Sequence, residues 1–447
     1  MFLKSLSISL VLSLLLGPIS VLADGNFTAF LSQYVSALQS AGFSGIANAL
    51  EAINGTTVGE QLLSRLANTT NNYTVFVPDN DAVRRIPTSI SSNASFFAEY
   101  ISYHIVEGDF TNTTNSSSSG GGSSSTTSSV TSSTSTSSGS TSSASATTAA
   151  LFGRLFAVLP RAGSGSSNPQ PYAGIYPNVT IGRTLLNSSD LVHLEGNQSQ
   201  VLAWTRYTPD GNVTMLNQAS FTGQNISITN STTWRNLFIN GINGVLIPPG
   251  NFSSALNATN TTALTALLST VQLPVFNGTN ETAIGALQNA TGITYFVPNN
   301  LAFTSDVNST LQGLQSNTSA LQTVVQNHYI NGTSLYSTLI DNSTTAVSAA
   351  GENLTFFVNS TGTFINGANN TVAQIVRPDV LLDNGVAHII NGVLFSTDSD
   401  PAVASSAYQS ATSVAAQSTT ETGPIAASTT TQSSTTSSTT ASQTTSA

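Results

Sequence analysis

The chain has 447 residues, carries a formal net charge of −10 at pH 7 and contains no cysteine. Nucleic acid is excluded as an expected partner, because binding to phosphates requires a basic surface. Disulfide bonds are excluded as well, so each domain has to be held together by its own hydrophobic core, for which the chain is long enough.

Residues 1–23 are predicted to be a secretory signal peptide. Lys4 forms a short basic region, the run from Leu6 to Leu16 is apolar, and the small-residue exit at Val21-Leu22-Ala23 predicts cleavage before Asp24. The apolar run is shorter than the ~20 residues that a transmembrane helix needs, and no later segment reaches that length, so no transmembrane span is predicted. The expected localisation is therefore secreted: extracellular, at the cell surface or in the cell wall.

The last residues of the sequence bear on membrane anchoring. They read Thr444-Thr445-Ser446-Ala447, without the hydrophobic tail of ~10 to 20 residues that a glycolipid-anchor signal requires. We therefore expect a released protein rather than a lipid-anchored one.

The hydrophobic periodicity changes along each half of the chain. Apolar residues at helical spacing predict amphipathic helices at 27–38, 43–53 and 58–67, and again at 252–256, 261–271 and 282–290. Further along each half, alternation of apolar and polar residues predicts strands at 179–181 and 200–206, and at 354–358 and 371–376. Helices that precede a sheet indicate the α+β class.

A motif of strand, proline turn and helix start occurs twice. Residues 74–83 read Thr-Val-Phe-Val-Pro-Asp-Asn-Asp-Ala-Val, and residues 293–303 read Ile-Thr-Tyr-Phe-Val-Pro-Asn-Asn-Leu-Ala-Phe. Because proline has no N–H to donate to a sheet, Pro78 and Pro298 are each expected to end a buried strand.

The residues after the first proline have two possible interpretations. Asp79-Asn80-Asp81 offers the oxygen ligands of a cation site, but Asx side chains after a strand also form the turn and the cap that begin a helix. We favour the turn and cap, with the same arrangement at Asn300 in the second motif. Asn80 and Asn300 are therefore predicted to be structural, and no metal and no cofactor are expected.

Two further motifs follow each proline motif. A histidine segment, Tyr103–Val106 or Asn327–Ile330, is followed by a closing segment, Ile242–Pro248 or Ile390–Phe395. Three motifs in the same order, twice, indicate two copies of one domain, which we call copy one and copy two.

These motifs resemble those of the fasciclin (FAS1) family, in which a Thr-Val-Phe-x-Pro-x-Asn box, a Tyr-His pair and a His-x-Ile-Asp-Gly-Val-Leu-like box follow one another. The resemblance covers both copies. It implies two FAS1-like domains of the α+β class, each a compact β-sandwich or wedge with a helical layer. Members of this family are found mainly in extracellular adhesion and matrix proteins, and this chain is similar to the fungal type of fasciclin-like protein.

The spacing of the motifs indicates an insertion inside copy one. His104 lies 136 residues before Asn240, whereas His328 lies only 60 residues before His388 at the equivalent position of the closing motif, so copy one holds about 76 additional residues. Two Ser/Thr-rich tracts lack the apolar surface that folding requires and resemble O-glycosylated stalks. The predicted organisation is domain 1 at 24–250 with a disordered insert at about 111–171, domain 2 at 251–396, and a disordered tail at 397–447.

The four histidines do not indicate catalysis. None has the spacing of a metal site or lies beside a plausible nucleophile. We expect His104, His328 and His388 to be buried rings that hydrogen-bond to the backbone. Copy one has Asn240 in place of His388, and an amide, which both donates and accepts, suits a structural hydrogen bond better than catalysis. No catalytic residue is predicted, and the protein is not expected to be an enzyme.

The family resemblance implies a candidate adhesion surface. In animal fasciclin proteins, adhesion to integrins is attributed to a Pro-Asp-Ile-like segment before the closing motif and to the Tyr-His region. The alternative interpretation of the matching segment here is a turn at the edge of a sheet. Copy one departs from the pattern at Thr233–Asn236, and no Arg-Gly-Asp tripeptide occurs. The candidate adhesion residues are Pro378, Asp379, Val380, His328, Tyr103 and His104.

Asn-x-Ser/Thr sequons are dense, with on the order of two dozen between Asn26 and Asn369, and each can accept an N-glycan where it is exposed in a secreted protein. A chain rich in Asn, Ser and Thr also generates sequons without selection, so only some are expected to be occupied. The candidates are Asn26, Asn54, Asn72, Asn93, Asn257, Asn331 and Asn353.

Together these features predict an extracellular adhesion glycoprotein of the cell surface or matrix that binds through its fasciclin-like domains. The alternative is a structural cell-wall component, in which the domains are glycan-linked spacers without a specific receptor. The expected partner is a cell-surface receptor, a matrix protein or a wall polysaccharide.

Overall fold

The computed structural model describes residues 24–114, 179–206, 211–219, 223–274 and 280–426. The predicted signal peptide, residues 115–171 of the predicted insert and residues 427–447 of the predicted tail lie outside these ranges. Within the described ranges, no helix has both the length and the apolar character needed to cross a membrane.

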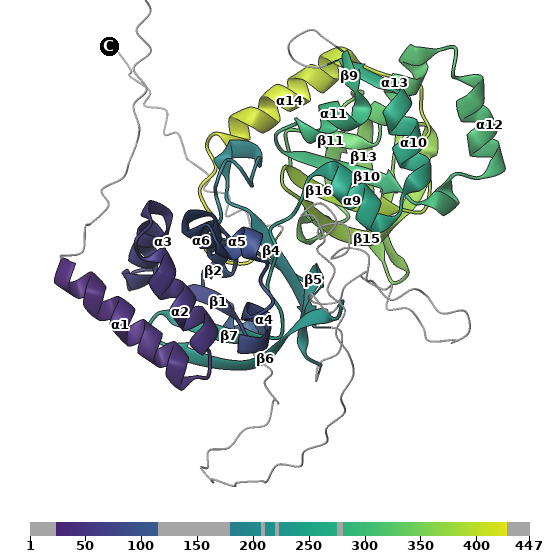
Figure 1. The fold of residues 1–447 in the computed structure, drawn as a ribbon. Coiled ribbons are helices and arrows are strands. Elements are labelled where there is room, and N and C mark those ends of the chain that lie inside the picture. Colours follow the sequence, from purple (N-terminus) through teal and green to yellow (C-terminus); the bar gives the residue numbers. More distant parts are fainter. Residues whose placement is uncertain (1–23, 115–178, 207–210, 220–222, 275–279, 427–447) are drawn as a thin grey trace, which may run out of the picture.

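Copy one begins with helices and continues with strands, drawn in purple to teal in Figure 1. The helices predicted at 27–38, 43–53 and 58–67 are confirmed as α1 to α3, and the predicted strands as β3 and β4. The helices are α1 (Asp24–Ser40), α2 (Ser44–Ile53), α3 (Thr57–Ala67), α4 (Asn80–Val83), α5 (Thr88–Ser91), α6 (Ala94–Tyr103) and α7 (Thr111–Thr114), with a 3-10 turn η1 (Glu195–Asn197). The strands are β1 (Tyr73–Pro78), β2 (Ile105–Glu107), β3 (Thr180–Arg183), β4 (Val201–Arg206), β5 (Val213–Ala219), β6 (Asn225–Trp234) and β7 (Leu237–Ile242).

Copy two repeats this order of elements. The predicted helices are present as α9 to α11, and the strand predicted at 371–376 is the first part of a longer strand, β15. The helices and 3-10 turns are α9 (Phe252–Thr259), α10 (Thr262–Thr270), α11 (Ala283–Gln288), η2 (Asn300–Ala302), α12 (Ser305–Gly313), α13 (Thr318–Gln326), η3 (Ser337–Leu339) and η4 (Ala368–Asn370). The strands are β8 (Gln272–Pro274), β9 (Asn280–Thr282), β10 (Ile293–Pro298), β11 (Tyr329–Asn331), β12 (Thr345–Val347), β13 (Asn353–Asn359), β14 (Gly362–Asn366), β15 (Val372–Leu382) and β16 (Gly385–Ile390).

Each copy contains a seven-stranded sheet, and the two sheets have the same strand order. It is β2-β1-β7-β6-β5-β4-β3 in copy one and β11-β10-β16-β15-β14-β13-β12 in copy two. In both, the strand of the proline motif runs parallel to the strand of the closing motif, while the remaining pairs are antiparallel. The register places Phe76 beside Asn240 and Phe296 beside His388, which makes Asn240 and His388 equivalent positions.

The proline motif joins the sheet to the helical layer in the same way twice. Asp79 caps α4, accepting a hydrogen bond from Ala82 N at 2.7 Å. Asn80 then accepts from Gly45 N at 2.8 Å and donates to the carbonyl of Gly42, so its amide holds the start of α2. Asn300 makes the equivalent pair of bonds at the start of α10. Asp79, Asn80 and Asn300 thus act in the turn and in contacts with the next layer.

Alternate residues of β1 face two different hydrophobic cores, because successive side chains of a strand point to opposite faces. Val75 and Val77 lie in a cluster with the helices α1, α2, α3 and α6. Phe76 lies on the other face, with its ring centroid 5.5 Å from that of Trp204. β10 divides its residues between two cores in the same way. Each copy is therefore a sheet with a helical layer on one face and its own strands folded over the other.

The prediction of a disordered tail from residue 397 is wrong as far as residue 426. Pro401–Ala415 form helix α14, drawn in yellow in Figure 1, and Asp400 caps its first turn by accepting from Ala402 N and Val403 N. The prediction of disorder from residue 111 is also wrong for the short helix α7, where Thr114 is fully buried. Local composition does not reveal the order of these segments, because their apolar contacts are made with distant parts of the chain.

After α14, the chain crosses to copy one and lies along β3, the last strand of its sheet. Ile425 N donates to Ile181 O at 2.9 Å. Glu421 forms a bidentate ion pair with Arg183, at 3.0 and 3.2 Å, and the Arg183 side chain is almost completely buried. Residues 400–426, which we call the C-terminal strap, therefore connect copy two to the sheet of copy one.

The two copies also touch directly. The Glu195 carboxylate accepts from both the N–H and the hydroxyl of Ser334, each at 2.7 Å, and Gln200 donates to Leu382 O at 2.9 Å. A hydrophobic cluster with members from copy one, copy two and the strap fills the contact. Its buried residues are Ile181, Val201, Ala203, Leu216, Tyr336, Leu381, Val386 and Ile425.

The strap is expected to stabilise copy one. Deleting residues 400–447 removes Ile425 from the shared cluster and leaves the Arg183 guanidinium buried without its carboxylate, which costs on the order of 3 kcal/mol when a buried pair is broken. Differential scanning calorimetry should show a clearly lower melting temperature. Deleting only residues 427–447 is the control, because it removes none of these contacts. Equal melting temperatures for the two deletions would contradict a stabilising role.

Candidate functional site

His104 and His328 lie at equivalent places and make equivalent hydrogen bonds. His104 is the C-cap of α6, with its Nδ1 3.0 Å from Tyr100 O and its Nε2 accepting from Leu246 N at 2.9 Å. His328 follows α13 and uses the same two nitrogens, at 2.7 Å from Val324 O and 2.9 Å from Leu394 N. Both rings are buried, so each joins a helix to the closing segment and neither reaches solvent.

His388 lies on β16, and its ring also bonds only to the backbone. Its Nε2 is 2.8 Å from Leu335 O, and its Nδ1 accepts from Asp379 N at 3.3 Å. At the equivalent position of copy one, the Asn240 side chain accepts from the Ser231 hydroxyl at 2.6 Å. Both side chains are fully buried.

The candidate adhesion segment is buried instead of exposed. Pro378, Asp379 and Val380 lie at a bulge in β15 opposite His388, and Asp379 takes a positive φ of 55° there. The bulge turns the Asp379 carboxylate inward, where it accepts hydrogen bonds from the N–H and the hydroxyl of Ser337. The carbonyl of Asp379 accepts from Asn217 of copy one. The segment is not a turn at a sheet edge either, since β15 has a strand on each side.

The remaining candidate of this group, Tyr103, is also inaccessible. Its ring is fully buried in copy one, and its hydroxyl donates to Val201 O at 3.2 Å. None of the six residues that the family resemblance implied for adhesion therefore presents its side chain to a partner in this structure.

The sequon asparagines have different environments. Asn72, Asn93, Asn257 and Asn353 are exposed, and Asn54 and Asn331 are partly buried. Asn26 lies in α1, in a part of the helix whose side chains are outside the described set. Asn93 also caps α6 through its side-chain oxygen, which leaves the amide nitrogen pointing away from that bond.

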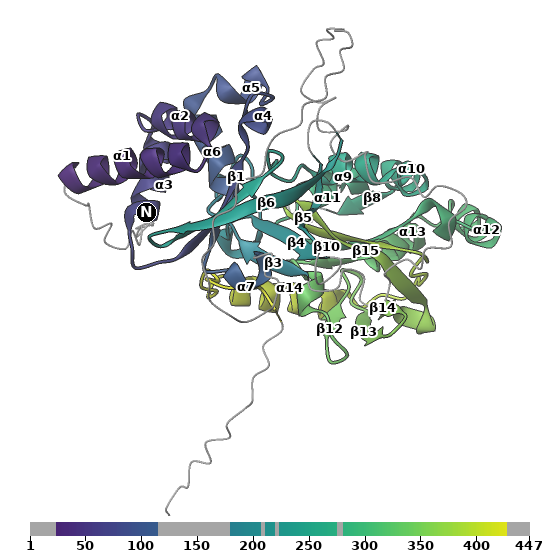
Figure 2. The same ribbon diagram turned by 90° about the horizontal axis from the view of Figure 1, so that it is seen from below.

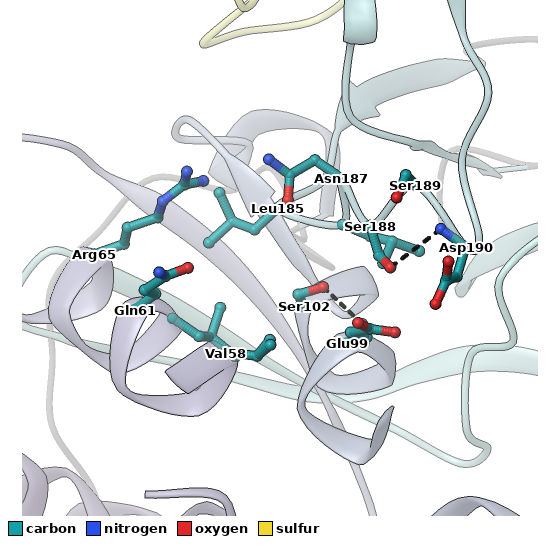
Figure 3. A pocket seen from close by; sticks show the side chains of 12 residues that line it. Val58, Gln61, Arg65, Glu99, Ser102, Leu185, Asn187, Ser188, Ser189 and Asp190 are labelled. Carbon is teal, nitrogen blue, oxygen red and sulfur yellow. Dashed lines mark hydrogen bonds between the residues drawn. The ribbon is translucent and has the colours of Figure 1, made fainter. Parts of the chain in front are cut away.

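A polar cavity of about 370 Å³ lies between α3, α6 and the segment that follows β3 (Figure 3). This cavity could not be recognised from the sequence, because its wall comes from segments that are distant in the chain. Its lining includes Val58, Gln61, Arg65, Glu99, Ser102, Leu185, Asn187, Ser188, Ser189 and Asp190.

The cavity has cationic and anionic ends. Figure 3 shows Arg65 at one end and Glu99 with Asp190 at the other. Burial raises the pKa of the Glu99 carboxyl, a hydrogen bond with Ser188 lowers it, and the charge of Asp190 raises it again. Within the described part of the chain, no group of three His, Cys, Asp or Glu side chains could hold a metal ion. The lining offers hydrogen bonds to a polar organic group rather than a nucleophile with its base.

A second surface feature is a pair of stacked rings on the sheet of copy two. Phe357 on β13 and Phe364 on β14 are directly opposite in the register, with ring centroids 4.7 Å apart and planes 4° from parallel. Phe357 is 37 % exposed, and Val372 on the neighbouring strand is 53 % exposed. An outward-facing ring could have been predicted from the sequence, because Phe356 and Phe357 are adjacent in a strand and cannot both face the core.

One comparison with known protein families identifies the family of this protein. The family model described as the fasciclin domain matches residues 32–151 and 251–396. The chain belongs to the fasciclin family, which confirms the resemblance and the predicted fold class of two FAS1-like α+β domains. The match in copy one ends at residue 151, and its sheet is completed by strands between Thr180 and Ile242.

The chain is also similar to the solved FAS1 domain pair of the insect cell adhesion molecule Fasciclin I, at 13 % sequence identity, covering 80 % of this chain and 98 % of that chain with a TM-score of 0.29. A comparison with curated proteins gave no match. Fasciclin domains are associated with extracellular and cell-surface adhesion proteins.

His388 is expected to contribute to stability only. Replacing His388 with Ala leaves Asp379 N and Leu335 O without their partner and opens a cavity, which should cost ~1 to 3 kcal/mol. His388→Asn should cost less, because copy one uses an amide at the same position. Urea unfolding of the full chain measures both. Equal losses for the two variants would contradict the assignment.

Protonation of the buried histidines is expected to destabilise the fold on acidification. Burial lowers the pKa of His104 and of His328 from the usual 6.5 to about 4, so the unfolded chain binds protons in this interval that the folded chain does not. The contribution of the neutral His104 and His328 rings to the free energy of unfolding is complete above pH 6.5 and is lost as the pH falls toward 4. The free energy of unfolding should fall less steeply between pH 7 and pH 5 in His328→Asn than in the wild-type protein. Parallel pH profiles would show that His328 is not the group responsible.

Proposed function

We propose that this protein is a secreted glycoprotein of the cell surface or wall that adheres through the ring pair of the exposed Phe357 and the half-buried Phe364 in its second fasciclin domain. The observation that carries the proposal is the pair itself. Two stacked aromatic rings with an exposed valine beside them form an apolar patch on a sheet face, and such patches mark interaction surfaces. The family and the predicted signal peptide support an extracellular role.

The position of the patch leaves it accessible. Figure 2 shows β12, β13 and β14 on the side of copy two remote from α9 and α10. Within the described residues, the strap touches the neighbouring strand β12 through α14, and Phe357 and Val372 nevertheless remain 37 % and 53 % exposed.

The chemistry around the rings favours a neutral polysaccharide. No residue of β12, β13 or β14 is charged, although the chain as a whole is acidic, so an ionic partner would find no complementary charge there. Gln374 and Asn366 lie beside Phe364 and Val372 in the register and supply amide groups at the rim of the apolar patch. Aromatic faces surrounded by uncharged hydrogen-bonding groups suit the apolar faces and hydroxyls of sugar rings.

The test is a binding measurement with insoluble wall polysaccharides. Phe357→Thr keeps a residue that favours strands but removes the ring, and it should weaken saturable binding by roughly tenfold, as loss of an aromatic anchor does. Leu301→Ser is the matched control, because Leu301 is 86 % exposed at a different place in the same domain. Asn353 and Asn359 begin sequons at the two ends of β13, so the protein is tested before and after deglycosylation.

Three outcomes are informative. Weaker binding of Phe357→Thr with unchanged binding of Leu301→Ser supports the proposal. Equal binding of all three proteins overturns the role of the ring pair. Saturable binding to matrix proteins instead of polysaccharides would assign a different partner.

The alternative function is a structural wall component in which the domains are glycan-linked spacers. The density of sequons and the exposure of Asn72, Asn93, Asn257 and Asn353 favour this candidate. It differs in its expected behaviour: the protein would resist detergent extraction from the wall and would bind no polysaccharide saturably.

In either case we propose the domain boundaries 24–250 and 251–396, with the strap as an additional connection between them.

A further inference from the structure

The cavity of Figure 3 has an N-glycosylation sequon on its rim. Asn187-Ser188-Ser189 satisfies the Asn-x-Ser/Thr pattern, and all three residues line the cavity. Asn187 is exposed and follows β3 by a few residues, on a segment that packs through Leu185 and Leu186 into the cores of copy one. The acceptor asparagine is therefore held on a fixed segment at the entrance of a cavity.

The Asn187 amide has no other structural task. Several sequon asparagines of this chain cap helices, among them Asn93, Asn251 and Asn317, each of which accepts a hydrogen bond from the first helical turn. No hydrogen bond of the Asn187 side chain is present within the described residues, and Figure 3 shows the side chain at the rim between Arg65 and Ser188. A glycan on its nitrogen would disrupt nothing.

The lining offers apolar surface and hydrogen-bonding groups that an N-acetylated sugar can use. The partly exposed Val58 supplies apolar surface for the methyl group and the ring carbons, and the buried Leu62 and Leu185 form the wall behind it. Gln61 and Arg65 provide donors, and Glu99 and Asp190 at the other end accept, so hydroxyl and acetamide groups find partners around the wall. The volume of about 370 Å³ falls within the range of small-molecule sites, roughly 300 to 1,000 Å³.

We propose that Asn187 carries an N-glycan and that the first N-acetylglucosamine of this glycan occupies the cavity between α3, α6 and the segment after β3. The sugar then joins three segments of copy one and closes the cavity to other ligands. This inference rests on the export that the proposed function requires, because N-glycans are added only in the secretory route.

The experiment uses the full chain secreted from a eukaryotic host. Asn187→Gln and Ser189→Ala each destroy the sequon, and Ser189→Ala does so with Asn187 left in place. Asn257→Gln is the matched control, since Asn257 is an exposed sequon residue on α9 that lines none of the described cavities. Intact mass and glycopeptide mapping give occupancy, endoglycosidase release from the native protein gives accessibility, and thermal unfolding gives stability.

If the sugar is seated in the cavity, the glycan of Asn187 should be released from the native protein several-fold more slowly than that of Asn257. The difference should vanish after denaturation. Asn187→Gln and Ser189→Ala should both lower the melting temperature by a few degrees, whereas Asn257→Gln should leave it unchanged. Slow release together with this loss of stability supports the proposal.

Other results overturn it. If Asn257 carries a glycan and Asn187 does not, the protein has passed through the secretory route but the proposed glycan at Asn187 is absent. Equal release rates and equal melting temperatures show that a glycan is present but lies outside the cavity. Secretion without any N-glycan would contradict the glycan at Asn187 alone. Failure of the protein to be exported would contradict the proposed function as well.

Discussion

The parallel pairing of two strands at the centre of each sheet is the constraint on which the structure depends. β1 pairs with β7 and β10 with β16, although the partners are far apart in the chain. The chain between them supplies the other five strands of the same sheet, and helices before and after the first strand of each pair form the layer on one face. The proline that ends β1 or β10 also fixes where the chain turns toward the helices, since it removes a donor from the ladder.

Buried polar groups reinforce this arrangement at a few places. His104 and His328 each join a helix to the closing segment by two backbone hydrogen bonds, and His388 fixes the bulge of β15. Because unsatisfied groups in these cores would be costly, the rings hold the closing segments and the bulge in place. The same bulge brings Asp379 against Asn217 of the other copy. Residues that a partner would need on the surface are thereby used to hold the two domains together.

Much of the fold could be predicted from local pattern. The repeat, the α+β class and the helices from α1 to α3 follow from hydrophobic period and from the proline motifs, since these signals depend on neighbours within a few residues. The strap could not be predicted in this way. Its Ser- and Ala-rich sequence contains few apolar residues, and its order depends on Ile181 and Arg183, more than two hundred residues earlier.

The sequence by itself determined that two copies of one domain are present, that each copy needs its own core, and that the histidines lie in apolar runs. Only the tertiary structure decided which residues face outward. It buried the Pro378–Val380 segment, exposed Phe357 and enclosed a cavity beside Asn187. The physical reason is that the exposure of a side chain depends on the elements packed around it, and those elements come from distant parts of the chain.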